Sequence, residues 1–274
     1  MTLSLSCNAW RTQDLMTIPA LKRLALIVEY DGTVFSGSQR QANTPTVQAC
    51  LEEALSKLTG AEVLVSMAGR TDAGAHARGQ VASFLTTSEM PPKAFIHGLN
   101  SYLPADIAVK SARFVGDGFD PRRQARARDY EYLILNRDSR SPLCQNRAYH
   151  VPGVIDVELM NQAASLLMGN HDLASFTCEL GEGKSTVRHI FRAACTREGE
   201  LVRFAISANA FLPHQVRITA GTLIRVGQRK LSVLDFKAIL EACQPGLAGP
   251  TAPACGLYLN KVVYNTNEEN NENV

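Results

Sequence analysis

The sequence predicts an α+β fold, and three observations lead to that class. Apolar runs of strand length alternate with segments of helical spacing throughout residues 22–264. These segments group into two units, and each unit mixes strands with helices that can pack on them. At 274 residues and 45% hydrophobic composition, the chain can bury a sizeable core. We therefore expect two α/β units with a cleft between them.

The first unit is predicted at residues 22–115. It opens with an apolar strand at 24–30, and the Asp31-Gly32 pair that follows is a strong turn signal. A helix then begins at a Thr44 cap and ends at Gly60. The other expected elements are strands at 62–68, 80–85 and 106–115 and a helix at 92–103. We expect this unit to be the N-terminal domain.

The second unit is predicted at residues 116–264. Its first strand, 128–136, places Tyr130 on one face and Glu131 on the other, because strand side chains alternate. A helix capped by Asp156 comes next. The other expected elements are two strands within 186–208, helices at 213–227 and 235–243, and a closing strand at 256–264. We expect this unit to be the C-terminal domain.

The two ends of the chain are predicted to be tails. Residues 1–21 lack the charged and apolar regions of a secretory signal, and we expect a tail there rather than an organelle leader. Residues 265–274 have the polar, acidic composition of a disordered segment. No apolar run approaches the roughly 20 residues of a membrane span.

The seven cysteines are widely spaced and include no C-x-x-C pair, which favours neither a zinc site nor a disulfide framework. Scattered thiols of this kind fit a reducing compartment. We therefore expect a cytoplasmic protein without a metal.

Positive charge is concentrated locally, although the net charge is only +2. Arginine is preferred over lysine, and the segment PRRQARAR holds four arginines within eight residues: Arg122, Arg123, Arg126 and Arg128. The planar guanidinium suits phosphate and base stacking better than the lysine ammonium. This arginine stripe predicts a nucleic-acid groove. A solvated charged loop is the alternative interpretation.

The segment AGRTDAGAHARGQVASF, residues 68–84, places Asp72 between Arg70 and Arg78 in a turn with several glycines. The glycines at 69, 74 and 79 permit positive φ and close approach of another chain. Such an aspartate often caps its own backbone. A neighbouring arginine would instead keep it ionised and ready to act as a nucleophile. In a basic cleft, a carboxylate would repel a polyanion unless it had a chemical task.

Motifs along nearly all of residues 23–264 resemble one family. The matching segments are YDGTVFSGSQRQ, TVQACLEEAL, AGRTDAGAHARGQVASF, NSYLPADIAV, FDPRRQARARDYEYLI, GNHDLASF, NAFLPHQVRITAGTLIRVG and APACGLYLNKVVY. On these motifs the chain resembles the tRNA pseudouridine synthase A (TruA-type) family, and the G-R-T-D-A-G core is the most specific of them.

The resemblance implies an isomerase without metal or cofactor that converts uridine to pseudouridine at positions 38, 39 and 40 of the tRNA anticodon arm. It assigns the nucleophile to Asp72, its partner arginine to Arg70, an active-site tyrosine to Tyr130 and a second arginine to Arg217. It also implies two related α/β units that share a continuous mixed, largely antiparallel sheet with packed helices and a central basic cleft. Homodimers of this family present tRNA across both subunits.

For RNA contacts we expect the arginine stripe on phosphates, with Arg78, His76 and Gln39 also facing the RNA. His171 and Asp172 are expected to be structural or to contact RNA. Three positions depart from the family pattern, and they leave open which tRNAs and positions are served: Ser38, Ala75 and Gln215. The loss of an aromatic residue at Ser38 is expected near the RNA-binding edge.

Alternatives to this assignment remain. Tyr130 could be a core tyrosine, and Arg217 could be a surface residue of an amphipathic helix. At the level of function, the alternatives are a non-catalytic tRNA-binding or chaperone module and, with less support, a hydrolase that uses Asp72 with a histidine.

Overall fold

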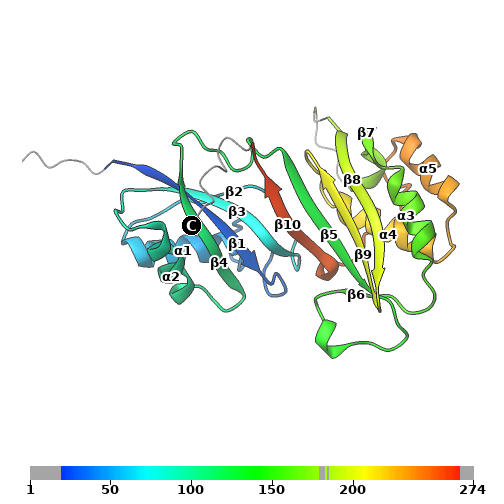
Figure 1. Ribbon diagram of the computed structural model, residues 1–274, viewed down its shortest axis with the longest axis horizontal. Coiled ribbons are helices and arrows are strands. Elements are labelled where there is room, and N and C mark those ends of the chain that lie inside the picture. The colour runs from blue at the N-terminus through cyan, green and yellow to red at the C-terminus, as the bar shows by residue number, and fades with distance from the viewer. Residues whose placement is uncertain (1–19, 179–182, 184, 266–274) are drawn as a thin grey trace, which may run out of the picture.

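The computed structural model describes residues 20–178, 183 and 185–265, which form one ten-stranded sheet with helices packed on it (Figure 1). The strand order along the sheet is β4-β1-β3-β10-β5-β9-β8-β7, and β2 and β6 pair with β3 and β5. The strands are β1 (Lys22–Tyr30), β2 (Ser66–Met67), β3 (His76–Thr86), β4 (Ile107–Val115), β5 (Ala127–Leu135), β6 (Tyr149–His150), β7 (Gly169–Asp172), β8 (Val187–Glu198), β9 (Leu201–Ala208) and β10 (Leu257–Val263).

Most neighbouring strands are antiparallel, and β10 joins the two halves of the sheet. It pairs in parallel with β3 and antiparallel with β5, so the last strand of the chain lies in the middle (Figure 1). Gly79 of β3 permits this pairing, because a Cβ there would lie 2.4 Å from the carbonyl oxygen of Asn260. The close approach expected at this glycine is thus made by the chain's own backbone.

The five α-helices of the described residues lie over the two halves of the sheet. They are α1 (Val47–Thr59), α2 (Pro92–Tyr102), α3 (Val157–Ser165), α4 (Gln215–Gly227) and α5 (Val233–Ala242). Helix α2 packs on β4 and α1 on α2, whereas α3 packs on β8 and α4 on β5 (Figure 1). None of these helices is both long and apolar enough to cross a bilayer.

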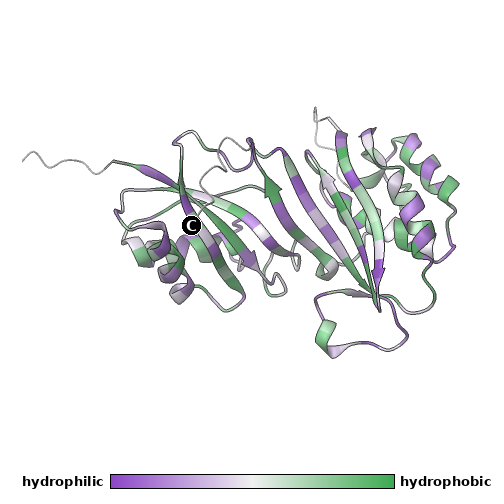
Figure 2. Cartoon of the chain, in the orientation of Figure 1, coloured by the Kyte–Doolittle hydropathy of each residue, from purple (hydrophilic) through white to green (hydrophobic). Residues whose placement is uncertain are grey.

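The sheet has two chemically different faces at its centre. Tyr130 and Tyr132 of β5 share a face with their β10 partners Leu259 and Leu257, because directly opposite residues point the same way. Glu131 points to the other face. Figure 2 shows hydrophilic and hydrophobic residues alternating along these central strands.

The predicted α+β class and the shared, largely antiparallel sheet are confirmed. The predicted unit boundary falls at the end of β4, and the division into domains stays a prediction. Helix α1 is capped by Thr46, whose side chain accepts the Ala49 N–H, and not by Thr44 as expected. The tail predictions for residues 1–19 and 266–274 lie outside the described residues.

Other boundaries differ for physical reasons. The strand expected at 62–68 shrinks to β2, because the side chains of Glu52 and Gln48 bind the backbone N–H and C=O of Val65 in place of a neighbouring strand. Strand β3 begins at His76, four residues earlier than expected, where β10 lies beside it. The short strands β6 and β7 were not predicted.

Candidate active site

The loop at residues 68–75 joins β2 to β3 and is held in shape from beneath. Thr71 donates its backbone N–H to Ser38 Oγ at 2.8 Å, and its own hydroxyl lies 2.7 Å from the buried Tyr30 hydroxyl. Burial raises the pKa of Tyr30 to about 12, despite the hydrogen bond from Thr71 that lowers it. Gly74 adopts φ +78°, a conformation that favours glycine. The loop therefore presents its carboxylate on a fixed backbone.

The Asp72 side chain is 27% exposed and faces helix α4. Its Oδ2 accepts a hydrogen bond from Arg217 Nη1 at 2.7 Å, and Arg217 Nε donates to the Ala252 carbonyl at 2.8 Å. The other oxygen, Oδ1, lies 3.6 Å from His214 Nε2. One carboxylate oxygen is thus occupied by an oriented guanidinium, while the other is left for a further partner.

Arg217 is the arginine that meets Asp72 in this structure. It is only 16% exposed, so the alternative of a surface arginine on α4 does not hold. Arg70 is exposed and lines the same cavity, but no ion pair joins it to Asp72. The sequence motif suggested that the flanking arginines hold the carboxylate, whereas the structure uses one from a helix 145 positions away.

A cavity of about 500 Å³ opens beside Asp72. The loop at 68–72, the segment 210–217 and side chains of β5 and β8 form its walls. Asp72 is the single carboxylate among its described lining residues, against five arginines: Arg70, Arg122, Arg128, Arg188 and Arg217. The excess of positive charge suits an anionic ligand.

Two aromatic rings border this cavity. Tyr130 lies edge-on to Phe211, with ring centroids 5.0 Å apart and planes at 80°. Tyr130 is 7% exposed, and burial raises its pKa above the ordinary tyrosine value. The ring therefore keeps its phenolic proton at neutral pH. The sequence left two interpretations of Tyr130, a core tyrosine and a site residue. In the structure Tyr130 is buried and also lines the cavity, so both are compatible with its position.

Three cavity residues with charged or aromatic side chains were not predicted as site residues from the sequence: Arg188, Phe211 and His214. Phe211 and His214 lie in the NAFLPHQVR segment that also holds Arg217, so their proximity in sequence was a usable signal. His214 has φ +57° at the start of α4, and its Nδ1 lies 3.0 Å from Cys178 Sγ. Arg188 at the start of β8 carried no local signal.

Two residues expected to face RNA are placed elsewhere. Arg78 contacts Glu131 and Asn260, and it lies over the Tyr258 ring at 4.4 Å, on the sheet face opposite Tyr130. His76 is 2% exposed. Its Nδ1 accepts the Gly32 N–H at 3.0 Å, and its Nε2 lies 2.8 Å from the Asn146 carbonyl. A direct RNA contact for His76 is inconsistent with this burial, and the residue instead ties three segments together.

The arginine stripe divides into one buried and three exposed residues. Arg128 donates to the carbonyls of Ala68, Arg122 and Asn209, so it supports the loop of Asp72 and is not free to hold a phosphate. Arg122 is exposed at the main cavity. Arg123 and Arg126 are exposed at a second cavity of about 640 Å³. The expected phosphate contacts thus stay a prediction for three of the four.

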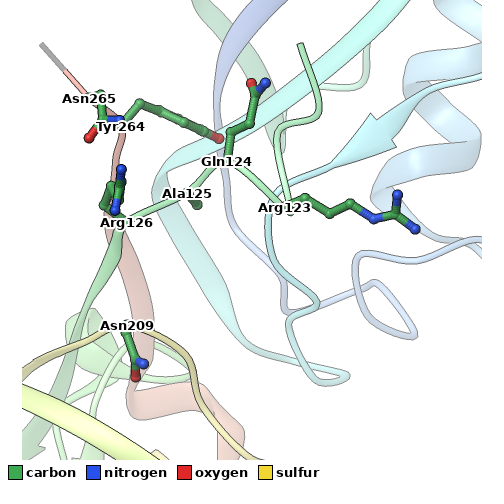
Figure 3. Close-up of a pocket in the computed structure, with 7 residues that line it drawn as sticks. All are labelled: Arg123, Gln124, Ala125, Arg126, Asn209, Tyr264 and Asn265. Atoms are coloured by element: carbon green, nitrogen blue, oxygen red, sulfur yellow. The ribbon is translucent and has the colours of Figure 1, made fainter. Parts of the chain in front are cut away.

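The second cavity lies at the junction between the end of β10 and the start of β5 (Figure 3). In Figure 3 the Arg123 side chain extends away from Arg126, Asn209 and Tyr264. The Asn209 carbonyl accepts from Arg128, which lines the main cavity, so one hydrogen bond links the walls of the two cavities. Gln39 is exposed as well, on the segment that precedes α1.

All three departures from the family pattern are buried. Ser38 is 1% exposed and accepts the Thr71 N–H beneath the loop of Asp72, and its expected place near the RNA-binding edge stays a prediction. Gln215 accepts the Leu212 N–H at 2.9 Å and is equally enclosed, as is Ala75. These positions therefore support the segments around the main cavity, and Gln215 also lines it.

Within the described ranges, no cluster of three or more His, Cys, Asp or Glu side chains is placed to hold a metal ion. His171 hydrogen-bonds the Met168 carbonyl and Asp172 accepts the Ala174 N–H, which are local structural contacts.

Comparison with known sequences identifies the family. A family profile described as "tRNA pseudouridine synthase" matches residues 26–122 and 163–265. The chain belongs to the tRNA pseudouridine synthase family. Proteins named tRNA pseudouridine synthase A from Caldicellulosiruptor bescii and Myxococcus xanthus are 43% and 44% identical to it, over 89% of this chain and 100% and 92% of theirs. A relative of the same name from Geotalea daltonii is 40% identical, over 89% of this chain and all of its own.

The two ranges matched by the tRNA pseudouridine synthase profile contain Arg70, Asp72 and Arg217. Tyr130 falls between them and joins the site through β5, which pairs with β10 and β9. The family is thus established by the comparison, and the roles of these residues stay predictions.

Proposed function

We propose that this chain isomerises uridine to pseudouridine at positions 38, 39 and 40 of the tRNA anticodon arm, with Asp72 as the nucleophile. The observation that carries the proposal is the partly exposed Asp72 carboxylate, whose Oδ2 is bound by Arg217 while Oδ1 is not hydrogen-bonded by a described residue. The close relatives named tRNA pseudouridine synthase A support the reaction and the substrate class.

The reaction needs an ionised and oriented carboxylate. The bond from the ribose C1′ to N1 breaks, the uracil rotates, and C1′ bonds to C5. The C5 proton is then released to solvent, and N1 takes up a proton, so that the product is an isomer of the substrate. Asp72 either adds to the uracil ring or assists departure of the base at the sugar, and Oδ1 is the oxygen available for both. Arg217 on Oδ2 orients the carboxylate and fixes the direction of attack.

The dimensions of the cavity support a flipped nucleotide. Small-molecule sites occupy about 300–1,000 Å³, and the cavity at Asp72 has about 500 Å³. A uridine within a stem must leave the stack to reach Asp72, which costs a few kcal/mol. The rings of Tyr130 and Phe211 offer a stacking surface that returns roughly 1–3 kcal/mol per base.

The charge distribution supports an RNA ligand. Arg70 and Arg122 line the main cavity with exposed side chains, and Arg123 and Arg126 line the neighbouring one. We assign these four to the phosphates on either side of the target nucleotide, where they would fix the register of the anticodon arm. Arg70 is then a substrate contact and not the partner of Asp72.

We also propose that the protein works as a homodimer in the cytoplasm, with tRNA lying across both subunits. The family resemblance supports this assembly, and the scattered thiols fit a reducing compartment. Sedimentation of the free protein and of its tRNA complex tests it: a monomer at working concentration in both states would contradict the dimer.

The test of function is chemical mapping of pseudouridine by carbodiimide. Unmodified tRNAs with a single uridine at position 38, 39 or 40 are incubated with the wild-type protein, with Asp72→Asn as the control. We expect modification by the wild-type protein at these positions alone. Tight tRNA binding without any pseudouridine would instead support a non-catalytic tRNA-binding module, and abasic sites would indicate a hydrolase.

A further inference from the structure

Arg188 is the least explained cation of the main cavity. Its side chain extends from the start of β8, and its Nη1 donates to the carbonyls of Ser185 and Val187 at 2.8 and 2.7 Å. These bonds hold the guanidinium against its own strand. Its Nε is buried and has no hydrogen-bond partner in the described chain. No carboxylate of the described residues lies within ion-pair distance of it.

An unpaired N–H of this kind is unusual. Buried polar groups are nearly always hydrogen-bonded, and a desolvated charge without a partner is costly. Burial accordingly lowers the pKa of the Arg188 guanidinium from its ordinary value. Because Nη1 is occupied, the edge formed by Nε and Nη2 is left for a ligand, which must displace the groups that cover Nε in the free protein. This edge matches two oxygens of a carboxylate or phosphate.

The other arginines of the cavity are used differently. Arg217 is bound to Asp72, and Arg128 donates its hydrogen bonds to backbone carbonyls. Arg70 and Arg122 are exposed, so water can hydrate them when RNA is absent. Arg188 alone combines a fixed guanidinium with a buried, unused donor in this wall. A fixed guanidinium with an unpaired N–H suits an anionic ligand group that binds at one defined position.

We propose that Arg188 binds the phosphodiester next to the target uridine through its Nε and Nη2 edge, once the nucleotide has entered the cavity. This rests on the proposed function of the same cavity. A uracil carbonyl is a poorer partner, because a neutral oxygen leaves the guanidinium charge uncompensated. Arg188 thus acts as a substrate-binding residue that selects the flipped nucleotide, in contrast to the exposed arginines that hold the stacked arm.

The experiment pairs a protein change with a change in the RNA. A methylphosphonate, which removes the negative charge of one linkage, is placed in turn at each linkage around the target uridine of an anticodon-arm RNA. Pseudouridine formation is measured as tritium release from 5-³H-uridine by the wild-type protein, Arg188→Gln and Arg188→Lys. In the wild-type protein we expect a methylphosphonate at one linkage next to the target to lower kcat/KM by about tenfold or more.

In Arg188→Gln that same linkage is expected to change kcat/KM by less than twofold, because the partner of the phosphate is already gone. The kcat/KM of Arg188→Gln should itself be about 10- to 100-fold below that of the wild type. The salt dependence of its RNA binding should weaken by about one released counterion. Arg188→Lys keeps the charge without the fork and should recover part of the loss. Persistence of the full methylphosphonate effect in Arg188→Gln would overturn the proposal.

Arg192→Gln is the matched control. Arg192 lies on the same strand, is exposed and pairs with Ser207, on the face opposite the cavity. It should keep the wild-type response at every linkage. A wild-type protein that releases no tritium would refute the proposed function, whereas tritium release with equal linkage effects in wild type and Arg188→Gln refutes only the role of Arg188.

Discussion

Two carboxylates on opposite faces of the same sheet are each bound by arginine, and their surroundings differ. Asp72 binds Arg217 in the cavity beside Tyr130, and it is 27% exposed. Glu131, which follows Tyr130 in β5, is 3% exposed and binds Arg78 and Arg203 on the other face of the sheet. In the first pair one oxygen remains open to a cavity, whereas in the second both oxygens have an arginine partner.

The comparison shows that an arginine–carboxylate pair does not by itself mark an active site. Glu131 does not line the cavity at Asp72, and its two arginine partners come from β3 and β9. At Asp72 the arginine comes from a helix, and the carboxylate stays accessible. The following predictions separate a catalytic pair from a structural one.

Among the changes that separate the two arginine–carboxylate pairs, the largest effect is expected for Arg217→Lys. Lysine keeps a positive charge but cannot hold both Asp72 and the Ala252 carbonyl as the guanidinium does. Arg217 orients the carboxylate through Oδ2, and loss of one oriented donor in an active site costs about 10²–10³-fold in kcat. Single-turnover tritium release should show this fall with tRNA binding unchanged. A kcat within threefold of wild type would show that the pair only supports structure, as at Glu131.

Tyr130→Phe should lower kcat by about 10²-fold, because a positioned proton-transfer group contributes at least that much. The ring remains, so tRNA affinity should hold. Burial raises the pKa of Tyr130, which means that its hydroxyl stays protonated as the pH rises through the ordinary tyrosine range. The alkaline limb of the rate profile should therefore have the same shape in both proteins. Loss of the alkaline limb in Tyr130→Phe would instead show that Tyr130 titrates within the ordinary tyrosine range.

Glu131→Gln should affect stability and leave the chemistry intact. Removal of a buried acceptor for charged donors lowers the free energy of unfolding by about 1.5–3 kcal/mol, and Arg78 and Arg203 are exposed enough to rehydrate. Denaturant unfolding measures the loss. Tritium release per folded molecule should remain within threefold of wild type. A loss as large as that of Arg217→Lys would show that the Glu131 pair is not merely structural.

The smallest effect is expected for Ser38→Ala. This change removes the acceptor of the Thr71 N–H, so that a buried donor loses its partner at a cost of about 1–3 kcal/mol. Because Thr71 precedes Asp72, kcat should fall a few-fold while KM holds. A rise in KM alone would instead show that Ser38 affects RNA binding and not the position of Asp72.

The sequence predicted what is local and repetitive. Strand 24–30, the Asp156 cap and the apolar face of α4 follow from periodicity and capping residues, and each is present. Asp72 was found because a carboxylate among arginines and glycines is conspicuous over a few residues. The resemblance added Arg217, which no local pattern ties to position 72.

Long-range pairing is what the sequence could not supply. The position of β10 between β3 and β5 depends on a parallel contact between residues about 180 apart. That pairing buries His76, and the bonds of Arg128 to three backbone carbonyls remove it from the RNA surface. Arg188 is one arginine among twenty in the sequence, and only the folded cavity distinguishes it.

The most direct test compares wild type and Asp72→Asn in a single turnover with 5-³H-uridine tRNA, at enzyme concentrations that bind all of the tRNA. Asparagine fills the same space and lacks only the negative oxygen that must attack. Tritium release is expected to fall by roughly 10⁴-fold or more, with the tRNA dissociation constant within threefold of wild type. Release by Asp72→Asn within tenfold of wild type would contradict the role of this carboxylate as the nucleophile.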